Sequence, residues 1–454
     1  MITSIALDNF RAFQEKVTIR VRPITILVGR NSAGKSSLLK FLLMLRQTLD
    51  SQSDSFFVTE GRHVQLGIWK DLRNTRNREQ HNLDSYFRYG IKIETQDLPP
   101  PDVRQLWKAS SRSNLVTEQA DKSILHLELH KEPVLSAQEI GQFSISGSVF
   151  YGSQFKYGRH EVDCLVDQKK IFTVKATNLE RTGFLRFGRR GDSVNGLIAS
   201  TTAEQFLEPL QNEILSLRHL SPIREESQQT IQMGSPPPND VGHRGEFAIP
   251  HLVRMFTRPE RSEEANFVSR FASTVADVGG IQFSSHVARL LTQGKARNLK
   301  TDAICSLADF GFGVSQCLPI FVQGAMQTRG QLLLVEQPEA QLHPTAQLEL
   351  GSFFASLWTE RRVPCIIETH SANIVLRLRK LISRGELAPA DVSIAYFNVE
   401  EVPQQRGNPI KTVVVKNIEI NPDGSLEQGL PMEFFGADIF EALDFGSTQE
   451  SSND

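Results

Sequence analysis

The amino-acid sequence predicts an α/β fold with a parallel central sheet, an antiparallel β subdomain and a helical lobe. Short, mainly apolar runs occur at 24–28, 332–335 and 365–367, and such runs are typical of buried central strands. Stretches with helical spacing separate these runs along the chain, and that alternation favours parallel strands. A long segment from about 80 to 200 has short alternating runs with turns between them, which indicates antiparallel strands.

The individual elements follow the same patterns. Ile2–Phe10 and Val17–Val21 are predicted strands, Ile24–Val28 is the buried strand, and Leu38–Leu49 has the apolar face of a helix. Residues 203–220 and 247–299 are predicted to be mostly helical. The strands expected in the middle segment are Tyr86–Ile93, Ile124–Leu129, Phe143–Phe150 and Phe172–Ala176.

The charge balance excludes a global basic field of the kind that nucleic-acid binders carry. Lys and Arg total 50 against 52 Asp and Glu, so the formal net charge is −2. DNA therefore stays a possible partner that the charge does not indicate. A local basic stretch at Arg181–Arg190 is flanked by acidic residues, and we interpret it as a solvated hairpin.

The cysteines and the chain start point to a reducing compartment. The chain has no Cys-x-x-Cys pair, which argues against a structural zinc site and against a disulfide framework; its four cysteines are Cys164, Cys305, Cys317 and Cys365. The N-terminal residues lack the pattern of a signal peptide, and no stretch reaches the roughly 18 apolar residues of a membrane helix. We therefore expect a cytoplasmic protein.

A phosphate-binding loop follows the first buried strand. Residues 29–36, Gly-Arg-Asn-Ser-Ala-Gly-Lys-Ser, match G-x-x-x-x-G-K-[ST]. In this motif backbone N–H groups surround phosphate oxygens, Lys35 reaches the β and γ phosphates, and the Ser36 hydroxyl joins a Mg²⁺ shell. ATP and Mg²⁺ are thus the expected cofactors. The residues expected to bind them here are Gly29, Arg30, Asn31, Ser32, Ala33, Gly34, Lys35, Ser36 and Ser37.

Acidic residues end the next buried strand. The run 331–339 is apolar and finishes in Glu336-Gln337-Pro338-Glu339, where phosphoryl transfer needs a carboxylate for Mg²⁺ and a group that orients water. The following apolar strand ends in Glu-Thr-His-Ser, which places His370 where it can contact a γ-phosphate. Upstream, a glycine-rich segment precedes a helix; by itself this motif fits a plain turn as well as a ligand loop. Its candidate residues are Gly311, Gly313, Ser315 and Gln316.

Together these motifs resemble the ATPase head of ABC and SMC proteins: a Walker A motif, a signature-like segment at 311–316, a Walker B motif and a switch histidine. More narrowly, residues 335–344 and 366–371 resemble the bacterial OLD/RecF-like ATPases, as does Asn-Phe-Arg-Ala-Phe at 9–13. The tail 418–435 looks like the small C-terminal extension of one branch of that group. The resemblance is strong over about 1–75 and 300–400 and vague over the middle segment.

This resemblance implies a P-loop, ABC/SMC-head-like fold with five segments. They are a first ATPase lobe with Walker A (1–75), an antiparallel β insert (76–202), a mainly helical subdomain (203–300), a second ATPase lobe with signature, Walker B and switch histidine (301–400), and a C-terminal extension with its tail (401–454).

The resemblance also implies an ATP-linked homodimer or higher oligomer. In such heads, each nucleotide lies between the Walker A motif of one subunit and the signature of the other. Ser315 and the backbone of 311–313 are thus expected to contact the γ-phosphate in trans, Arg11 to approach the phosphates from the first hairpin, and His370 to sense the γ-phosphate.

One departure from the family pattern concerns catalysis. Most relatives have Asp-Glu where this chain has Glu336-Gln337. Glu336 can serve Mg²⁺, but Gln337 is no general base and can only orient a water. Two alternatives follow: Glu339 acts as the base, or hydrolysis is slow.

A fused nuclease is not expected. Many OLD relatives carry a Toprim domain with an Asp-x-Asp motif after the ATPase, and residues 401–454 contain no such motif. The segment Asp163–Lys169 faintly resembles a restriction-type metal site, but a turn at 167–168 between two strands explains it better.

The predicted function is an ATP-binding and hydrolysing switch that dimerises on ATP and controls a separately encoded effector, such as a nuclease or toxin. The ATPases that this chain resembles include those of Septu and retron-associated systems, which act in bacterial anti-phage defence. By this resemblance we expect a role in defence. One alternative is a RecF-like DNA-repair clamp. Another is an ABC transporter motor, which the β insert and the lack of an LSGGQ-type signature disfavour.

Overall fold

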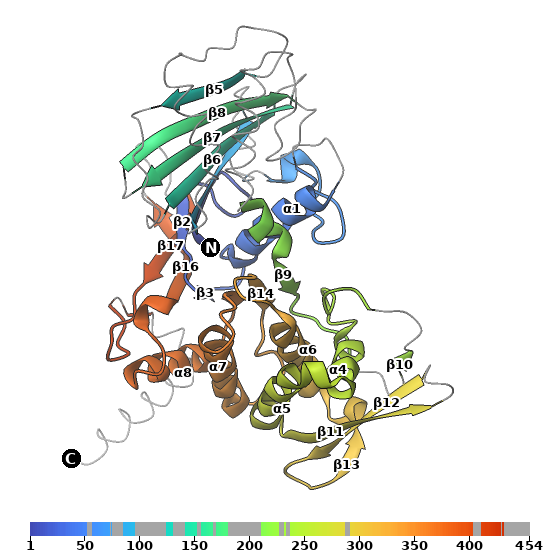
Figure 1. The fold of residues 1–454 in the computed structure, drawn as a ribbon. Helices are drawn as coiled ribbons and strands as arrows, with labels where there is room; N and C mark the ends of the chain where they lie inside the picture. Colours follow the sequence, from blue (N-terminus) through green and yellow to red (C-terminus); the bar gives the residue numbers. More distant parts are fainter. Residues whose placement is uncertain are drawn as a thin grey trace, which may run out of the picture. The chain divides into compact units, whose positions relative to one another are not determined.

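The structure is a computed structural model, and its contacts divide the chain into two units (Figure 1). The first unit comprises Met1–Val21, Arg30–Leu217 and Phe397–Lys416. The second comprises Arg22–Gly29, Arg218–Tyr396 and Asn417–Asp454. The residues described are 1–51, 57–72, 74, 85–95, 124–129, 141–151, 156–166, 169–179, 210–226, 231–232, 237–286, 291–402, 410–427 and 429–430.

The first unit contains a seven-stranded antiparallel sheet in the order β2-β1-β4-β6-β7-β8-β5. Figure 1 labels β6, β7, β8 and β5 of this sheet, which lie side by side. Its N-terminal strand β1 pairs with β4, so the first hairpin and the middle segment share one sheet. This confirms the predicted antiparallel β structure. The strands are β1 (Ile2–Asp8), β2 (Val17–Arg20), β4 (Ser85–Thr95), β5 (Ile124–Leu129), β6 (Gly141–Tyr151), β7 (Lys156–Val166) and β8 (Lys169–Leu179).

Helix α1 (Lys35–Asp50) packs on this sheet through aromatic side chains. The ring of Phe41 lies 5.5 Å from that of Phe10 and 5.7 Å from that of Tyr89 on β4. Phe10 in turn lies 5.2 Å from Phe87. Fully buried aromatic side chains each contribute about 1.5–3 kcal/mol, so this cluster fixes α1 against β4. The short helix η1 (Trp69–Leu72) belongs to the same unit.

The second unit is built on parallel strands. β3 (Ile24–Gly29) pairs with β15 (Cys365–Glu368), which pairs with β14 (Leu333–Glu336), and β9 (Arg218–Leu220) completes this side. The whole sheet has the order β17-β16-β3-β15-β14-β9, where β16 is Val392–Val402 and β17 is Ile410–Ile418. All six residues of β3 are buried, as its apolar run predicts. The α/β class is confirmed.

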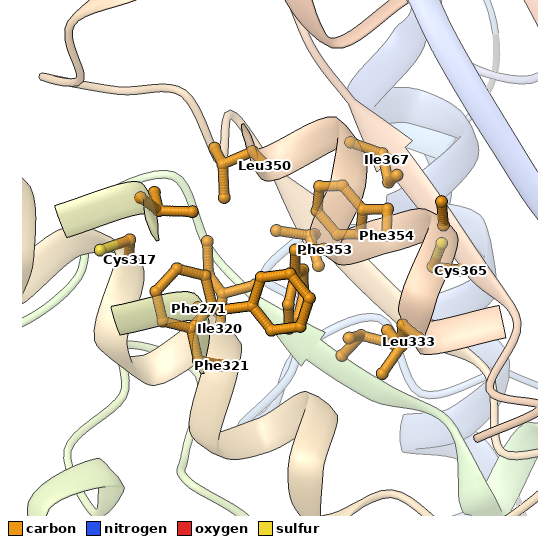
Figure 2. Close-up of a cluster of buried hydrophobic side chains, with 14 of the residues drawn as sticks. Phe271, Cys317, Ile320, Phe321, Leu333, Leu350, Phe353, Phe354, Cys365 and Ile367 are labelled. Carbon is orange, nitrogen blue, oxygen red and sulfur yellow. The ribbon is translucent and has the colours of Figure 1, made fainter. Parts of the chain in front are cut away.

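Helices of the second unit enclose a phenylalanine cluster. The helices are α4 (Ala248–Thr257), α5 (Ser262–Ala276), α6 (Phe312–Met326), α7 (Pro344–Thr359) and α8 (Ala372–Ser383). Figure 2 shows Phe271 of α5, Phe321 of α6 and Phe353 of α7 gathered together. The Phe353 ring lies 5.0 Å from Phe321 and 5.1 Å from Phe271. Leu333 of β14 and Ile367 of β15 belong to the same core, so the helices are fixed to the parallel sheet.

The mainly helical prediction is wrong over Val278–His286 and Leu291–Asn298. These residues form the antiparallel strands β11 (Val278–His286) and β12 (Leu291–Asn298). Helix α5 ends because Asp277 adopts a left-handed conformation (φ 54°), and the glycine pair Gly279-Gly280 after it disfavours helix. Strands β10 (Ile231–Gln232) and β13 (Ile304–Ser306) pair with β12.

Other sequence predictions have mixed outcomes. Residues 210–216 are helical, but 218–220 form β9, so the helix predicted over 203–220 is wrong at its end. The hairpin at Arg181–Arg190, the turn residues 167–168 and the tail from 431 lie outside the described residues. Among the helices that the structure describes, none has the length and apolarity needed to cross a membrane. The five-segment division stays a prediction.

Candidate functional site

Two glycines of the phosphate-binding loop have a backbone with positive φ. Strand β3 ends at Gly29 (φ 136°), and α1 begins at Lys35 after Gly34 (φ 96°). A Cβ atom on Gly34 would lie 2.9 Å from Cε1 of Phe13 and 3.1 Å from Cβ of Ala12. Any side chain at this position would therefore meet both backbone strain and a steric clash.

The start of α1 suits an anion. Its first turn has no acidic residue, and Gly34 has no side chain to cap the helix. Helix N-termini of this kind bind phosphate through backbone N–H groups and the helix dipole. Lys35 is 3% exposed, and its Nζ donates a hydrogen bond to the Arg30 carbonyl at 2.7 Å. Arg30, Asn31 and Ser32 are exposed, Ser36 and Ser37 are partly buried, and Ala33 is buried.

The turn that carries Arg11 lies beside this loop. Phe13 and Ala12 border Gly34, as the predicted approach of the first hairpin requires. Arg11 has a left-handed backbone (φ 47°), its N–H donates to the Leu72 carbonyl at 2.8 Å, and its Nη1 lies 3.5 Å from the Leu66 carbonyl. The turn is thus fixed by its main chain.

In the second unit, three parallel strands end at one edge of the sheet. Glu336 at the end of β14 pairs in register with Glu368 at the end of β15, and Glu368 pairs with Leu27 of β3. Gly29, the first residue of the phosphate-binding motif, therefore lies at the same edge as the two glutamates. Ligands of open α/β sheets bind beyond this edge.

Glu336 is held at its side chain and at its main chain. Its Oε1 lies 2.7 Å from Nε2 of His219, and its carbonyl accepts a hydrogen bond from Nη2 of Arg224 at 2.6 Å. The side chain is 14% exposed. The next residue, Gln337, has a left-handed backbone (φ 43°), and its N–H donates to the Glu368 carbonyl at 2.7 Å. The chain thus turns sharply directly after the carboxylate.

Glu339 connects the two strand ends. Its Oε1 accepts a hydrogen bond from the His370 N–H at 2.7 Å. Burial raises the pKa of Glu339, and the His370 N–H acts against that rise. Its Oε2 is buried without a hydrogen-bond partner among the described residues, while the His370 side chain is exposed.

The signature-like segment begins α6. Gly311 has φ 86° and ψ 169°, a region that is essentially restricted to glycine. A Cβ atom on Gly313 would lie 3.3 Å from the Gln341 carbonyl oxygen, so this glycine allows α6 to approach the loop after β14. Ser315 is 3% exposed.

The side chain of Gln316 is bonded inside the second unit. It is 1% exposed, its Oε1 accepts the Arg224 N–H at 3.2 Å, and its Nε2 donates to the Arg224 carbonyl at 3.1 Å. Both amide atoms are therefore engaged inside the unit. Gln316 thus joins α6 to the segment after β9, and its predicted contact with a nucleotide stays a prediction.

The sequence motifs missed three residues at this edge: His219, Arg224 and Glu368. Glu368 had a usable signal, since it ends a buried strand in the same way as Glu336. His219 lies in the three-residue strand β9 and Arg224 lies shortly after it, and a strand of this length is too short to show a periodicity in the sequence. Burial lowers the pKa of Arg224 to about 10, and the carboxylates of Glu339 and Glu336 oppose that shift.

The residues present fit ATP with Mg²⁺. In the part of the chain that the structure describes, no group of three His, Cys, Asp or Glu side chains is placed to enclose a metal ion. Nucleotide-bound Mg²⁺ needs no such cage, because phosphates, waters and one or two protein oxygens supply its ligands. Ser36 in the first unit and Glu336 in the second each carry an oxygen of this kind. Within the second unit, Oε2 of Glu339 is buried without a hydrogen-bond partner among the described residues and can accept a hydrogen bond from a bound water.

Comparison with known proteins gives solved structures but no curated relative: no curated protein matches the chain. An SMC head bound to the C-terminal winged-helix domain of ScpA has 10% identity and a TM-score of 0.39, and the match covers 91% of this chain and 98% of that one. The SMC head domain from Thermotoga maritima has 9% identity, a TM-score of 0.35 and the same two coverages. An SMC head with an extended coiled coil, bound to the C-terminal domain of ScpA from Pyrococcus furiosus, has 9% identity, a TM-score of 0.38, and coverages of 92% and 96%.

The family model described as an AAA ATPase domain matches residues 1–175 and 253–375, more than half of the chain. These matched ranges include the phosphate-binding loop, the acidic end of β14 and His370. The chain therefore belongs to the AAA ATPase domain family.

Proposed function

We propose that this ATPase is a slow molecular switch, which binds ATP with Mg²⁺, dimerises on ATP and controls a separately encoded effector. The observation that carries the proposal is Gln337. A glutamine stands directly after the Mg²⁺-type carboxylate Glu336, and its left-handed backbone is hydrogen-bonded to Glu368. An amide at the position where the resemblance leads us to expect a general base supports slow hydrolysis.

The proposed binding roles are supported by the local geometry of each element. The backbone of residues 29–34 and the start of α1 bind the phosphates, and Lys35 exchanges its bond to the Arg30 carbonyl for phosphate oxygens. Ser36 and Glu336 are the protein oxygens that hold Mg²⁺, which supplies charge neutralisation on the phosphates when bound. His370 has an exposed side chain suited to contact a γ-phosphate.

The proposal of slow turnover is supported by the chemistry of the Gln337 and Glu339 side chains. The amide of Gln337 has no titratable proton acceptor, so it orients a water without deprotonating it. Glu339 carries a carboxylate, but one of its oxygens accepts the His370 N–H and links the two strand ends. We assign Glu339 to that structural link, and this choice favours slow hydrolysis over the alternative in which Glu339 is the base.

Dimerisation is supported by the start of α6. This helix begins at an exposed Gly311 without a side-chain cap and without an acidic residue in its first turn. Such a helix N-terminus is suited to bind the γ-phosphate of an ATP molecule held by a second copy of the chain. Ser315 is buried, so its predicted contact in trans requires its backbone or a shift of this turn.

The test measures nucleotide binding and mass together. The purified chain is titrated with a fluorescent ATP analogue, and its mass is measured by light scattering with ATP, with ADP and without nucleotide. We expect ATP to convert monomer to dimer, ADP to leave monomer, and Lys35→Ala to lose both effects. A chain that binds ATP without any change in mass contradicts the dimer. A chain that does not bind ATP contradicts the whole proposal.

The effector and the defence role need a cellular test. Resemblance to Septu and retron-associated ATPases suggests a nuclease or toxin encoded next to this chain. Co-expression of the chain with that neighbour is expected to protect bacteria from phage, and Lys35→Ala is expected to abolish protection. Strong stimulation of ATP turnover by duplex DNA, with no effect of the neighbour, favours a RecF-like clamp instead.

A further inference from the structure

Glu336 is held by a segment that none of the nucleotide-binding motifs contains. We name residues 218–224, which comprise β9 and the turn after it, the brace. β9 is the strand next to β14, and the two are parallel, with Leu334 opposite His219. The brace therefore runs along β14 towards the edge at which Glu336 lies, and it contacts Glu336 at two separate points.

The first contact fixes the carboxylate. Nε2 of His219 lies 2.7 Å from Oε1 of Glu336, the length of a strong charge-assisted hydrogen bond. His219 is 9% exposed, so little water competes for this carboxylate oxygen. The contacts among the described residues engage Oε1 only, which leaves Oε2 as the oxygen that the carboxylate presents to a ligand.

A second histidine sets the orientation of the first. Nδ1 of His219 lies 3.0 Å from Nδ1 of His243, and the two rings are 5.2 Å apart between centroids. An imidazole held at both nitrogens has one ring orientation available. The chain His243–His219–Glu336 thus fixes the rotamer of the glutamate from behind.

The second contact fixes the main chain. Nη2 of Arg224 donates to the Glu336 carbonyl at 2.6 Å, and Arg224 is also bonded to Gln316 at the start of α6. This carbonyl directly precedes Gln337 with its left-handed backbone. Side chain and main chain of Glu336 are both held, in the manner of groups that orient metal ligands.

We propose that His219 is a positioning residue for the Mg²⁺ carboxylate Glu336, with His243 supporting it. This inference rests on the proposed function, because it assigns the His219–Glu336 contact to cofactor binding. A purely structural role is the competing explanation. If the His219–Glu336 pair served only the fold, removal of His219 would change the free energy of unfolding and leave the Mg²⁺ dependence of ATP binding unchanged.

The experiment separates metal dependence from nucleotide affinity and from folding. Affinity of the full chain for a fluorescent ATP analogue is measured in EDTA and across a titration of free Mg²⁺. The variants are His219→Leu, which removes the donor, and His219→Gln, whose Nε2 keeps a donor close to the same place. His251→Leu is the matched control, since His251 is 4% exposed and bonds to the Pro238 carbonyl away from Glu336.

We expect equal affinities in EDTA for all four proteins. The Mg²⁺ concentration at half-effect should rise by about 10–100-fold in His219→Leu, the usual cost of losing such an orienting partner. It should stay close to that of the unchanged chain in His219→Gln and in His251→Leu. Thermal unfolding of each variant reports stability separately.

Two results overturn the inference. One is an unchanged Mg²⁺ half-point in His219→Leu, and the other is an equally large shift in His219→Gln. If His219→Leu does not fold, His219→Asn replaces it, because its shorter amide cannot reach Oε1 and is expected to give the same shift. A failure of the unchanged chain to bind ATP contradicts the proposed function itself, whereas ATP binding with Mg²⁺ dependence insensitive to His219 contradicts only this inference.

Discussion

Replacement of Arg224 by methionine tests whether the buried guanidinium serves the site or the fold. Arg224 is 2% exposed and donates from its side chain to the Glu336 carbonyl at 2.6 Å and to the Gln316 carbonyl at 3.3 Å. Its two main-chain bonds to the Gln316 amide do not depend on the side chain. Methionine is unbranched and flexible but shorter, so Arg224→Met removes the charge and fills only the part of the space nearest the main chain.

The opposing free energies nearly cancel. The Glu336 carbonyl loses its side-chain donor, which costs about 1–3 kcal/mol for a buried acceptor. Against this, burial lowers the pKa of Arg224 from 12.5 to about 10, and at 1.36 kcal/mol per pKa unit that corresponds to about 3 kcal/mol of unfavourable burial that methionine avoids. We therefore expect Arg224→Met to change the free energy of unfolding by less than about 2 kcal/mol in either direction.

The assay compares stability with metal-dependent binding. Denaturant unfolding is followed by the fluorescence of Trp358 on α7, with Trp69 and Trp107 replaced by phenylalanine so that the second unit alone reports. Mg²⁺-dependent ATP affinity is expected to fall by about tenfold or more, because the main chain of Glu336 is no longer held. The control is Arg361→Met, whose guanidinium donates to the Ala325 carbonyl. A loss of more than about 4 kcal/mol with unchanged affinity would refute the reasoning.

Three further substitutions test individual features. Gly34→Ala adds a Cβ 2.9 Å from the Phe13 ring at φ 96°, so we expect the melting temperature to fall and ATP affinity to drop at least about tenfold in calorimetry. Gly311→Ala meets no atom within 4 Å, and strain at φ 86° alone should cost about 1–3 kcal/mol in denaturant unfolding; a cost near zero would show that this backbone is not fixed. The raised pKa of Glu339 means that the folded state gains stability below the ordinary value of 4.5 and loses it as pH rises through the higher folded value. Glu339→Gln should remove that pH dependence of the melting temperature without a large loss of ATP turnover, and a large loss would identify Glu339 as the base.

The parallel sheet and the phosphate-binding loop could be predicted because their signals are local. β3 is a mainly apolar strand, buried along its whole length and followed directly by the motif, and the acidic run after β14 marks the same sheet edge. Strands buried on both faces have this composition in any α/β fold. The antiparallel sheet was predictable from alternation, although its pairing with β1 was not, because pairing depends on register across more than 80 residues.

The brace could not be predicted, since its function arises from tertiary contacts. β9 has only three residues, too few for any periodicity, and Arg224 follows it in a segment without regular structure. Gln316 had a motif that suggested a ligand role, yet its side chain is buried against Arg224, 92 residues away in sequence. The β11–β12 hairpin was misread because its polar residues are also compatible with a helix surface, although Gly279, Gly280 and Gly294 argued against a helix.

The measurement that tests the central claim most directly is steady-state ATP turnover of the purified chain beside Gln337→Glu. The glutamate has the same size as the glutamine and suits the same left-handed backbone, so only the chemistry of the group changes. We predict turnover below the roughly 1 s⁻¹ lower end of typical enzymes for the unchanged chain, and a rise of about 10²-fold in Gln337→Glu as a general base is restored. Fast turnover by the unchanged chain alone, or no gain in the variant, would contradict the account of a slow switch.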